Sequence, residues 1–178
     1  MKHHRIIDSP LGHILLRAEA GALTGLFFSG QKYYPEHSAQ EGVVSGADAR
    51  VLAQAEEELQ AYFDGSLQVF TVPIRFAGSP FQQRIWQALC DIGFGEMSTY
   101  GQLAAGIGLP PSHSRAVGGA VGRNPLSVIV PCHRIVGASG DLTGYAGGVD
   151  RKRALLSLEG TLHRPAMRQA SFALIPDC

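Results

Sequence analysis

The chain has 178 residues, of which 45% are hydrophobic and 17% are charged, so it can bury a core and is not a disordered chain. Its formal charge is zero overall, but residues 1–78 carry −3 and residues 79–178 carry +3, which places any polyanionic partner on the second part. No apolar segment opens the chain or approaches the roughly 20 residues of a membrane span, so we expect a cytoplasmic protein that meets no membrane and keeps its cysteines reduced.

The first part of the chain predicts a small α/β support unit. Short strands, separated by glycine and proline turns, are expected at residues 4–8, 13–19 and 22–28. A helix is expected over residues 48–63, where apolar side chains recur at helical spacing until Gly65 ends it. Residues 69–72 predict one more strand. No group of residues in this part carries chemistry.

After Gly78 the pattern changes to helices that begin with capping residues. Ser79 caps a helix whose first residue is Pro80. Three more helices are expected, at residues 100–105, 114–121 and 151–159. Thr99 caps the first of these and Ser112 caps the second.

The helices at 100–105 and 114–121, joined by a short turn, suggest a helix-turn-helix. The second helix has Gly118 and Gly119 in its interior, which costs roughly 1 kcal/mol each relative to alanine. Close approach to another backbone offsets such a cost. Two explanations are about equally supported, namely tight helix–helix packing inside the protein and contact with nucleic acid.

Cys132 follows an apolar run, residues 126–130, which predicts a short buried strand that Pro131 ends. The neighbouring cations His133 and Arg134 favour a thiol pKa below the usual value of about 8.5. Neighbours in an extended chain point to opposite faces, so a water bridge between the cysteine and the histidine is more natural than direct contact, unless the chain turns sharply. An inert buried cysteine is an equally supported interpretation.

Two further segments point to a binding site. The basic run at residues 151–153 lies at a helix start, against the macrodipole preference, and indicates either an anionic partner or a solvated helix end. The glycine-rich segment 137–148 contains Tyr145 and is long enough to line a pocket, although it has no phosphate-binding pattern. The seven histidines show no metal-ligand spacing, so we predict no metal.

Four motifs carry a resemblance to a known family. They are Arg115-Ala116-Val117-Gly118, Asn124-Pro125, Pro131-Cys132-His133-Arg134 and Thr143-Gly144-Tyr145-Ala146-Gly147-Gly148. Together they resemble the O6-alkylguanine-DNA alkyltransferase family, also called methylated-DNA–protein-cysteine methyltransferases, in its bacterial form. The similarity runs almost continuously from Phe81 to Gly160 and is looser in the first part of the chain.

The resemblance implies an α/β fold in two domains. The first is a ribonuclease-H-like α/β support domain over residues 1–75, and the second is a winged-helix-like, mainly helical catalytic and DNA-binding domain over residues 79–163. Residues 164–178 are expected to form a flexible tail. The resemblance also implies repair of double-stranded DNA carrying O6-alkylguanine, by a monomer that binds the minor groove. A flipped-out base gives its alkyl group to the cysteine once, irreversibly and without a cofactor.

The resemblance assigns catalytic roles to five residues. Cys132 is the nucleophile and alkyl acceptor, and His133 takes its proton through a water. Glu159 orients His133, as a third group orients the base in other triads. Asn124 holds the turn that carries the cysteine, and Tyr100 gives a proton to the departing guanine.

The resemblance also assigns DNA and base contacts. Arg115 fills the gap that the flipped base leaves in the stack. The DNA-binding residues are Thr99, Ser114, Arg115, Ala116, Gly118 and Gly119. The base pocket is formed by Ile135, Tyr145, Ala146 and Lys152. Two other functions compete with this interpretation: a protein that flags the lesion without chemistry, and a cysteine hydrolase that turns over.

The sequence departs from the family pattern at residues 108–114, a turn that is one residue longer than usual. His113 lies there, where family members carry small residues. This histidine predicts pH-sensitive DNA binding, which His113→Ala tests: the prediction fails if the variant keeps the pH dependence of DNA affinity.

Overall fold

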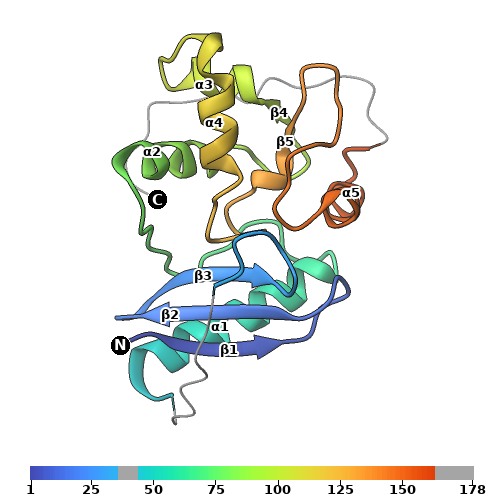
Figure 1. Cartoon of the computed structure of the whole chain (residues 1–178). Coiled ribbons are helices and arrows are strands. Elements are labelled where there is room, and N and C mark those ends of the chain that lie inside the picture. Colours follow the sequence, from blue (N-terminus) through green and yellow to red (C-terminus); the bar gives the residue numbers. More distant parts are fainter. Residues whose placement is uncertain (36–43, 163–178) are drawn as a thin grey trace. The chain divides into compact units, whose positions relative to one another are not determined.

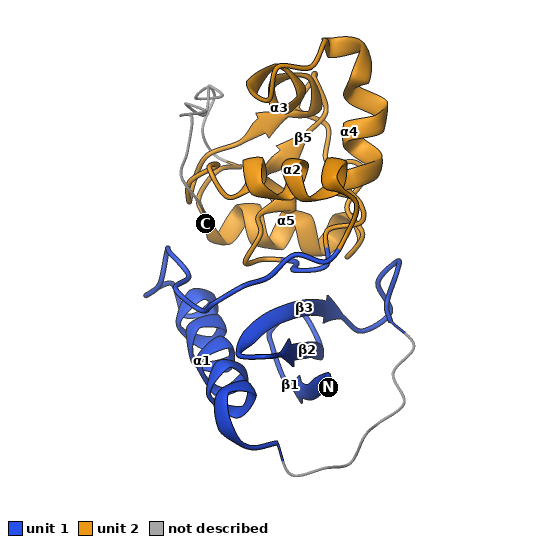
Figure 2. Ribbon diagram, turned by 90° about the vertical axis from the view of Figure 1, so that its left-hand side faces the viewer, with its two compact units in different colours: residues 1–77, 125–127 blue, residues 78–124, 128–178 orange. Residues whose placement is uncertain are grey.

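The computed structural model describes residues 1–35 and 44–162, and the chain divides into two compact units (Figures 1 and 2). Unit 1 contains residues 1–77 and 125–127, and unit 2 contains residues 78–124 together with the described residues from 128 onward. The predicted tail, residues 164–178, lies outside the described residues. None of the helices in the described ranges is long and apolar enough to cross a membrane.

Unit 1 is built on a three-stranded antiparallel sheet in the order β1-β2-β3 (Figure 1). The strands are β1 (His3–Ile7), β2 (Ile14–Glu19) and β3 (Ala22–Phe28), within a residue of their predicted positions. Helix α1 (Gly46–Phe63) begins two residues before its predicted start and lies along one face of the sheet (Figure 2). Its apolar stripe is buried as predicted, through Val51, Leu52, Ala55, Leu59 and Tyr62.

The strand predicted at residues 69–72 is wrong. The backbone N–H groups of Thr71 and Val72 donate to a carboxylate oxygen of Glu58, at 2.9 and 3.1 Å, so a side chain takes the place of a strand partner. The chain instead joins the sheet two residues later, where Ile74 forms a single parallel bridge with Leu23.

Unit 2 contains four helices among its described residues: α2 (Pro80–Leu89), α3 (Tyr100–Gly106), α4 (Ser114–Val121) and α5 (Val149–Leu158). The predicted caps Ser79 and Thr99 are confirmed, since each forms a capping box with the glutamine three residues later. Helix α4 packs against α2 and α3, and the indole of Trp86 donates to the carbonyl of Ala120 at 2.9 Å. These contacts make α2, α3 and α4 one helical cluster.

A short parallel strand pair connects this cluster to the cysteine segment. Strand β4 (Ser98–Thr99) pairs with β5 (Ile135–Val136), with Ser98 opposite Ile135. In Figures 1 and 2 the pair lies between helices α3 and α4 on one side and α5 on the other. The start of α3 therefore lies beside the segment that follows Cys132.

The predicted cap at Ser112 is wrong. A 3-10 turn, η1 (Pro111–His113), precedes α4, and the capping position falls on His113, whose side chain makes no capping hydrogen bond. Two consecutive prolines explain the shift, because Pro111 has no N–H and its fixed φ suits the first position of a helical turn.

The strand predicted at residues 126–130 is also wrong. Leu126 makes one bridge, to Leu26 within unit 1, and Val128 then adopts a left-handed φ of 71°. That conformation is rare for a β-branched residue, so the surrounding structure must impose it. The Asn124 amide donates to the Val130 carbonyl at 2.8 Å and holds these residues as a closed loop.

Candidate active site

Cys132 opens a one-turn 3-10 helix, η2 (Cys132–Arg134), rather than following a strand. The turn is closed by a hydrogen bond from the Arg134 N–H to the Pro131 carbonyl at 3.0 Å. The chain therefore turns sharply, and the alternation expected of an extended segment does not apply. All three residues of η2 are buried, with exposed fractions of 4% for Cys132, 0% for His133 and 6% for Arg134.

The sulfur of Cys132 is held by Asn124. The side-chain amide nitrogen lies 3.0 Å from Sγ, and the same nitrogen donates to the Val130 carbonyl. Burial raises the pKa of the Cys132 thiol to about 11, although the Asn124 hydrogen bond and the charge of Lys152 act in the opposite direction. The lowered thiol pKa predicted from its basic neighbours is thus wrong, because desolvation outweighs them. The resting protein carries a protonated thiol that needs a base.

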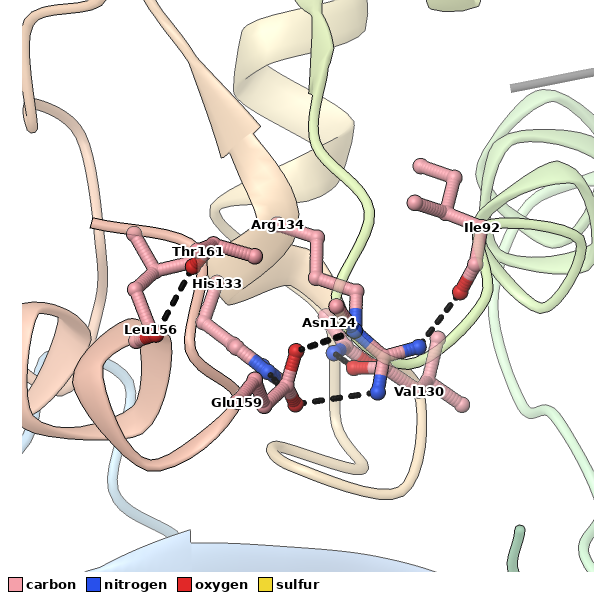
Figure 3. A network of polar contacts seen from close by, with 9 residues as sticks. Ile92, Asn124, Val130, His133, Arg134, Leu156, Glu159 and Thr161 are labelled. Atoms are coloured by element: carbon pink, nitrogen blue, oxygen red, sulfur yellow. Dashed lines mark hydrogen bonds and ion pairs between the residues drawn. The ribbon is translucent and has the colours of Figure 1, made fainter. Parts of the chain in front are cut away.

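His133 is placed to act as that base. Its Nε2 lies 2.8 Å from Oε1 of Glu159, and both side chains are fully buried (Figure 3). An ionised carboxylate only accepts hydrogen bonds, so Nε2 carries the proton and donates it. In the described part of the chain, Nδ1 is buried and has no hydrogen-bond partner. Its lone pair is available to accept a proton.

Glu159 is fixed by the end of helix α5. It occupies the C-cap, where its N–H donates to the Leu155 carbonyl at 3.0 Å. Gly160 then takes a left-handed φ of 71°, and Thr161 returns two hydrogen bonds to the Leu156 carbonyl, from its N–H and from its hydroxyl. This termination fixes the backbone that carries the carboxylate.

The charge states follow from the surroundings. Burial acts to raise the pKa of Glu159, but the hydrogen bonds and charges of His133 and Arg134 hold it below its ordinary value. Burial lowers the pKa of His133 below its ordinary value, Glu159 acts to raise it, and Arg134 and Lys152 lower it further. The site therefore rests with an ionised carboxylate and a neutral imidazole.

Arg134 belongs to the site, although its partner could not be found from the sequence. Its Nε donates to Oε2 of Glu159 and its Nη2 to Oε1, both at 2.9 Å, and its Nη1 donates to the carbonyl of Ile92 (Figure 3). A signal was present: an arginine between a cysteine motif and an apolar pair has to be paired if it is buried. The motif did not identify the carboxylate 25 residues later as the partner.

Lys152 and Tyr100 meet at the carbonyl of Thr143. Lys152 is fully buried, and its Nζ donates to the carbonyls of Ile135 and, at 2.9 Å, of Thr143. The Tyr100 hydroxyl donates to the same Thr143 oxygen at 3.2 Å. Burial lowers the pKa of Lys152 to about 8, against the raising effect of Cys132, and burial followed by the charge of Cys132 raises the pKa of Tyr100. Lys152 is therefore neither a solvated helix end nor a surface cation.

The predicted pocket segment closes around these groups. Ile135 and Tyr145 are buried and Ala146 is half-buried. A Cβ on Gly144 would lie 2.7 Å from the Tyr100 hydroxyl, and the left-handed φ of 75° there also favours glycine. The absence of a side chain at this position lets the loop approach Tyr100.

The outer surface of α4 carries the predicted DNA contacts. Arg115 and Ala116 are exposed, and Gly118 and Gly119 are half-buried. A Cβ on either glycine would meet neighbouring atoms no closer than 3.6 Å, which is ordinary contact. Tight internal packing therefore does not require these glycines, and their contact with DNA stays a prediction.

Two of the predicted DNA contacts occupy helix starts, and the exposed His113 lies beside them. Thr99 caps α3, while Ser114 begins α4 and donates from its hydroxyl to the Pro111 carbonyl. The pH sensitivity of DNA binding that His113 suggested stays a prediction.

Among residues 1–35 and 44–162, no group of His, Cys, Asp and Glu side chains is arranged to hold a metal ion.

Two family models match the chain and together span most of it. The model described as the DNA-binding domain of 6-O-methylguanine DNA methyltransferase matches residues 80–161, and the one described as its ribonuclease-like domain matches residues 2–76. The predicted fold class, an α/β protein with a small ribonuclease-like domain and a mainly helical DNA-binding domain, is confirmed.

Individual relatives are similar over nearly the whole chain. The methylated-DNA–protein-cysteine methyltransferase of Mycobacterium tuberculosis is 47% identical over 162 residues, which cover 89% of this chain and 93% of the relative. The protein of that name from Haemophilus influenzae is 42% identical over 161 residues, covering 88% and 86%. The crystal structure of Mycobacterium tuberculosis OGT in complex with DNA superposes with a TM-score of 0.79 at 46% identity, covering 89% and 93%.

Proposed function

The chain belongs to the 6-O-methylguanine DNA methyltransferase family, and we propose that it repairs DNA by moving the alkyl group of O6-alkylguanine to its own Cys132. The observation that carries this proposal is the buried thiol of Cys132 beside a neutral His133 whose Nδ1 is open and whose Nε2 is tied to Glu159. A nucleophile, a base and a group that orients the base are the parts that such a transfer needs.

The transfer starts with the thiol proton. It passes through a bridging water to Nδ1 of His133, and the resulting imidazolium is stabilised by Glu159 at 2.8 Å. The sulfur then forms a bond to the alkyl carbon while the bond from that carbon to O6 breaks. The electron pair of the broken bond stays on the guanine. The product is a thioether, so each molecule acts once.

The guanine leaves as an anion unless it gains a proton. We assign that proton to the Tyr100 hydroxyl, which in the free protein donates to the Thr143 carbonyl and turns to the base when the pocket is filled. The raised pKa of Tyr100 keeps its proton in place until the leaving group demands it. Ile135, Tyr145 and Ala146 form the walls of the base pocket, and the buried Lys152 holds its loop.

The DNA partner is duplex DNA that carries the lesion, bound through the minor groove by a monomer. Helix α4 presents Arg115, Ala116, Gly118 and Gly119, a small-residue surface that approaches the backbone without reading base sequence. Arg115 enters the stack in place of the flipped base, with Thr99 and Ser114 on the flanking phosphates. The relative from Mycobacterium tuberculosis that was solved with DNA supports the partner class. We also propose that the protein acts in the cytoplasm, where it meets its DNA substrate.

The test is the intact-protein mass after incubation with a duplex containing O6-methylguanine. We expect a stoichiometric gain of one methyl group, mapped to Cys132 by peptide analysis and absent in Cys132→Ser. Tight lesion binding without any gain contradicts transfer and favours a lesion-flagging protein. Product that exceeds the protein in amount contradicts single use and favours a hydrolase.

A further inference from the structure

We propose that Arg134 is a positioning residue for alkyl transfer, which holds Glu159 so that His133 stays a neutral base with Nδ1 open. This inference rests on the proposed function, because it concerns the same proton transfer. Arg134 follows the cysteine–histidine pair directly, and the η2 turn directs its side chain to the same carboxylate that His133 uses.

The geometry is that of a fork on a carboxylate. Nε and Nη2 of Arg134 each lie 2.9 Å from a different oxygen of Glu159, which fixes the plane of the carboxylate as well as its position. Oε1 also accepts from Nε2 of His133 at 2.8 Å, so one oxygen joins the arginine to the base. Rotation of the carboxylate would break all three hydrogen bonds at once.

The opposite side of the guanidinium is also anchored. Nη1 donates to the Ile92 carbonyl, and the Phe94 ring centroid lies 6.0 Å from the guanidinium carbon. Figure 3 shows the guanidinium between Ile92 and the Glu159 carboxylate. The arginine is therefore held by α5 on one side and by the segment after α2 on the other. A lysine could supply the charge there but not the fork.

The charges around His133 explain why the arginine matters for chemistry. Glu159 faces the imidazole and favours its protonation, whereas Arg134 on the same turn and Lys152 on α5 oppose it, and the Cys132 thiol next to it is neutral at rest. Without the arginine, the uncompensated carboxylate would raise the pKa of His133. A histidine that is already protonated cannot accept the thiol proton.

The pH profile of single-turnover methyl transfer to Cys132 tests the inference. Neutral His133 is required, so the rate falls as the pH falls through its pKa. We expect Arg134→Gln to shift this acidic limb upward by about one pH unit and to slow transfer by roughly 10–100-fold at neutral pH. Arg134→Lys keeps the charge, so the limb stays in place while the rate falls by roughly 3–10-fold through loss of the fork.

A matched control is the arginine–glutamate pair of Arg5 and Glu56 in unit 1, also 2.9 Å long but about one-third exposed. Arg5→Gln should leave the rate and the acidic limb unchanged. A second control uses Glu159→Gln as background: if Arg134 acts through Glu159, adding Arg134→Gln there changes the rate by no more than about twofold.

The inference is overturned if Arg134→Gln slows transfer equally at every pH, or if its effect persists in full in the Glu159→Gln background. If Arg134→Gln fails to fold, two other variants are measured: Arg134→Lys, and the double variant Arg134→Gln/Glu159→Gln, which removes both charges together. Their transfer rates and the positions of their acidic limbs then test the inference. Methyl transfer by the unaltered chain is measured in the same series. Its absence would contradict the proposed function, whereas its presence with an unmoved limb contradicts only the role of Arg134.

Discussion

The two units use their charged side chains in opposite ways. In unit 1, carboxylates satisfy nearby backbone donors: the half-buried Glu58 accepts from Thr71 and Val72, and Asp48 accepts from the Gly21 N–H at 2.6 Å. In unit 2, four ionisable side chains are buried near Cys132, namely His133, Arg134, Lys152 and Glu159. The first arrangement completes a fold, whereas the second surrounds a reactive atom.

This difference indicates which of the two units carries the chemistry. Burying an ion pair stabilises a protein little, and replacing it with apolar residues of similar size is often neutral or stabilising. A chain that buries four ionisable groups next to one thiol has therefore not placed them for stability. Their use is to set the protonation states of His133 and Cys132.

The largest expected effect comes from removing the Glu159 carboxylate, and the Glu58 carboxylate of unit 1 serves as the comparison. Glu159→Gln removes the charge that orients and stabilises the His133 imidazolium, so we expect methyl transfer to slow by roughly 10²–10⁴-fold. DNA affinity should change by no more than about threefold, because the carboxylate is buried away from DNA. Glu58→Gln in unit 1 should leave transfer unchanged. Single-turnover kinetics and a DNA-binding titration measure both, and equal losses of rate and affinity would contradict an orienting role.

The next effect is on the free energy of unfolding, and it compares the Arg134–Glu159 pair with the Arg5–Glu56 pair. Arg134→Gln leaves Glu159 buried without its main partner, so we expect the free energy of unfolding to fall by about 3–5 kcal/mol. Arg5→Gln breaks a pair that is about one-third exposed, so its expected cost is about 0–1 kcal/mol. Urea unfolding followed by fluorescence of Trp86 reports on unit 2, and circular dichroism reports on both units. Equal losses would mean that burial does not distinguish the pairs.

The buried cluster also predicts how stability depends on pH. His133 and Glu159 have folded pKa values below their ordinary ones, so their contribution is present at neutral pH. That contribution is lost as the pH falls below about 6.5 for the histidine and about 4.3 for the glutamate. The Cys132 thiol has a raised pKa of about 11, so its contribution is lost as the pH rises from about 8.5 toward that value.

We therefore expect the free energy of unfolding to fall below about pH 6.5. On the alkaline side the thiol causes a decline that Lys152 opposes, because its lowered pKa of about 8 lets the folded protein release that proton before the unfolded chain does. Urea unfolding at a series of pH values measures the curve. Cys132→Ser, which has no thiol to ionise, should lose the alkaline decline and keep the acidic one. An alkaline decline of the same size in the serine variant would place its origin outside the cysteine.

Local signals carried most of the fold prediction. The caps Ser79 and Thr99 and the strands of unit 1 depend on neighbours within a few residues, so the sequence was enough to locate them. The segment at 126–130 was mispredicted because its β-branched residues favour a strand. Its loop depends on the Asn124 amide, which contacts Val130 and Cys132, six and eight residues further along the chain. No local propensity encodes contacts of this kind.

The site shows the same limit in its chemistry. The cysteine motif indicated Cys132 and His133 as a pair, and the family resemblance supplied Glu159. The direction of the thiol pKa came out wrong because sequence shows the cations near Cys132 but not its burial. The fork of Arg134 was missed for a related reason: the carboxylate that it binds lies 25 residues away, across helix α5.

The smallest expected effect concerns Gly118 and Gly119 of α4, where substitution should change stability and DNA affinity in opposite directions. Gly118→Ala and Gly119→Ala place a Cβ in ordinary contact distance of its neighbours, so each should raise the free energy of unfolding by about 0.5–1 kcal/mol through helix propensity. If α4 lies against DNA, the same methyl groups should weaken lesion binding several-fold. Gains in stability at both positions with no loss of DNA affinity would remove α4 from the DNA interface.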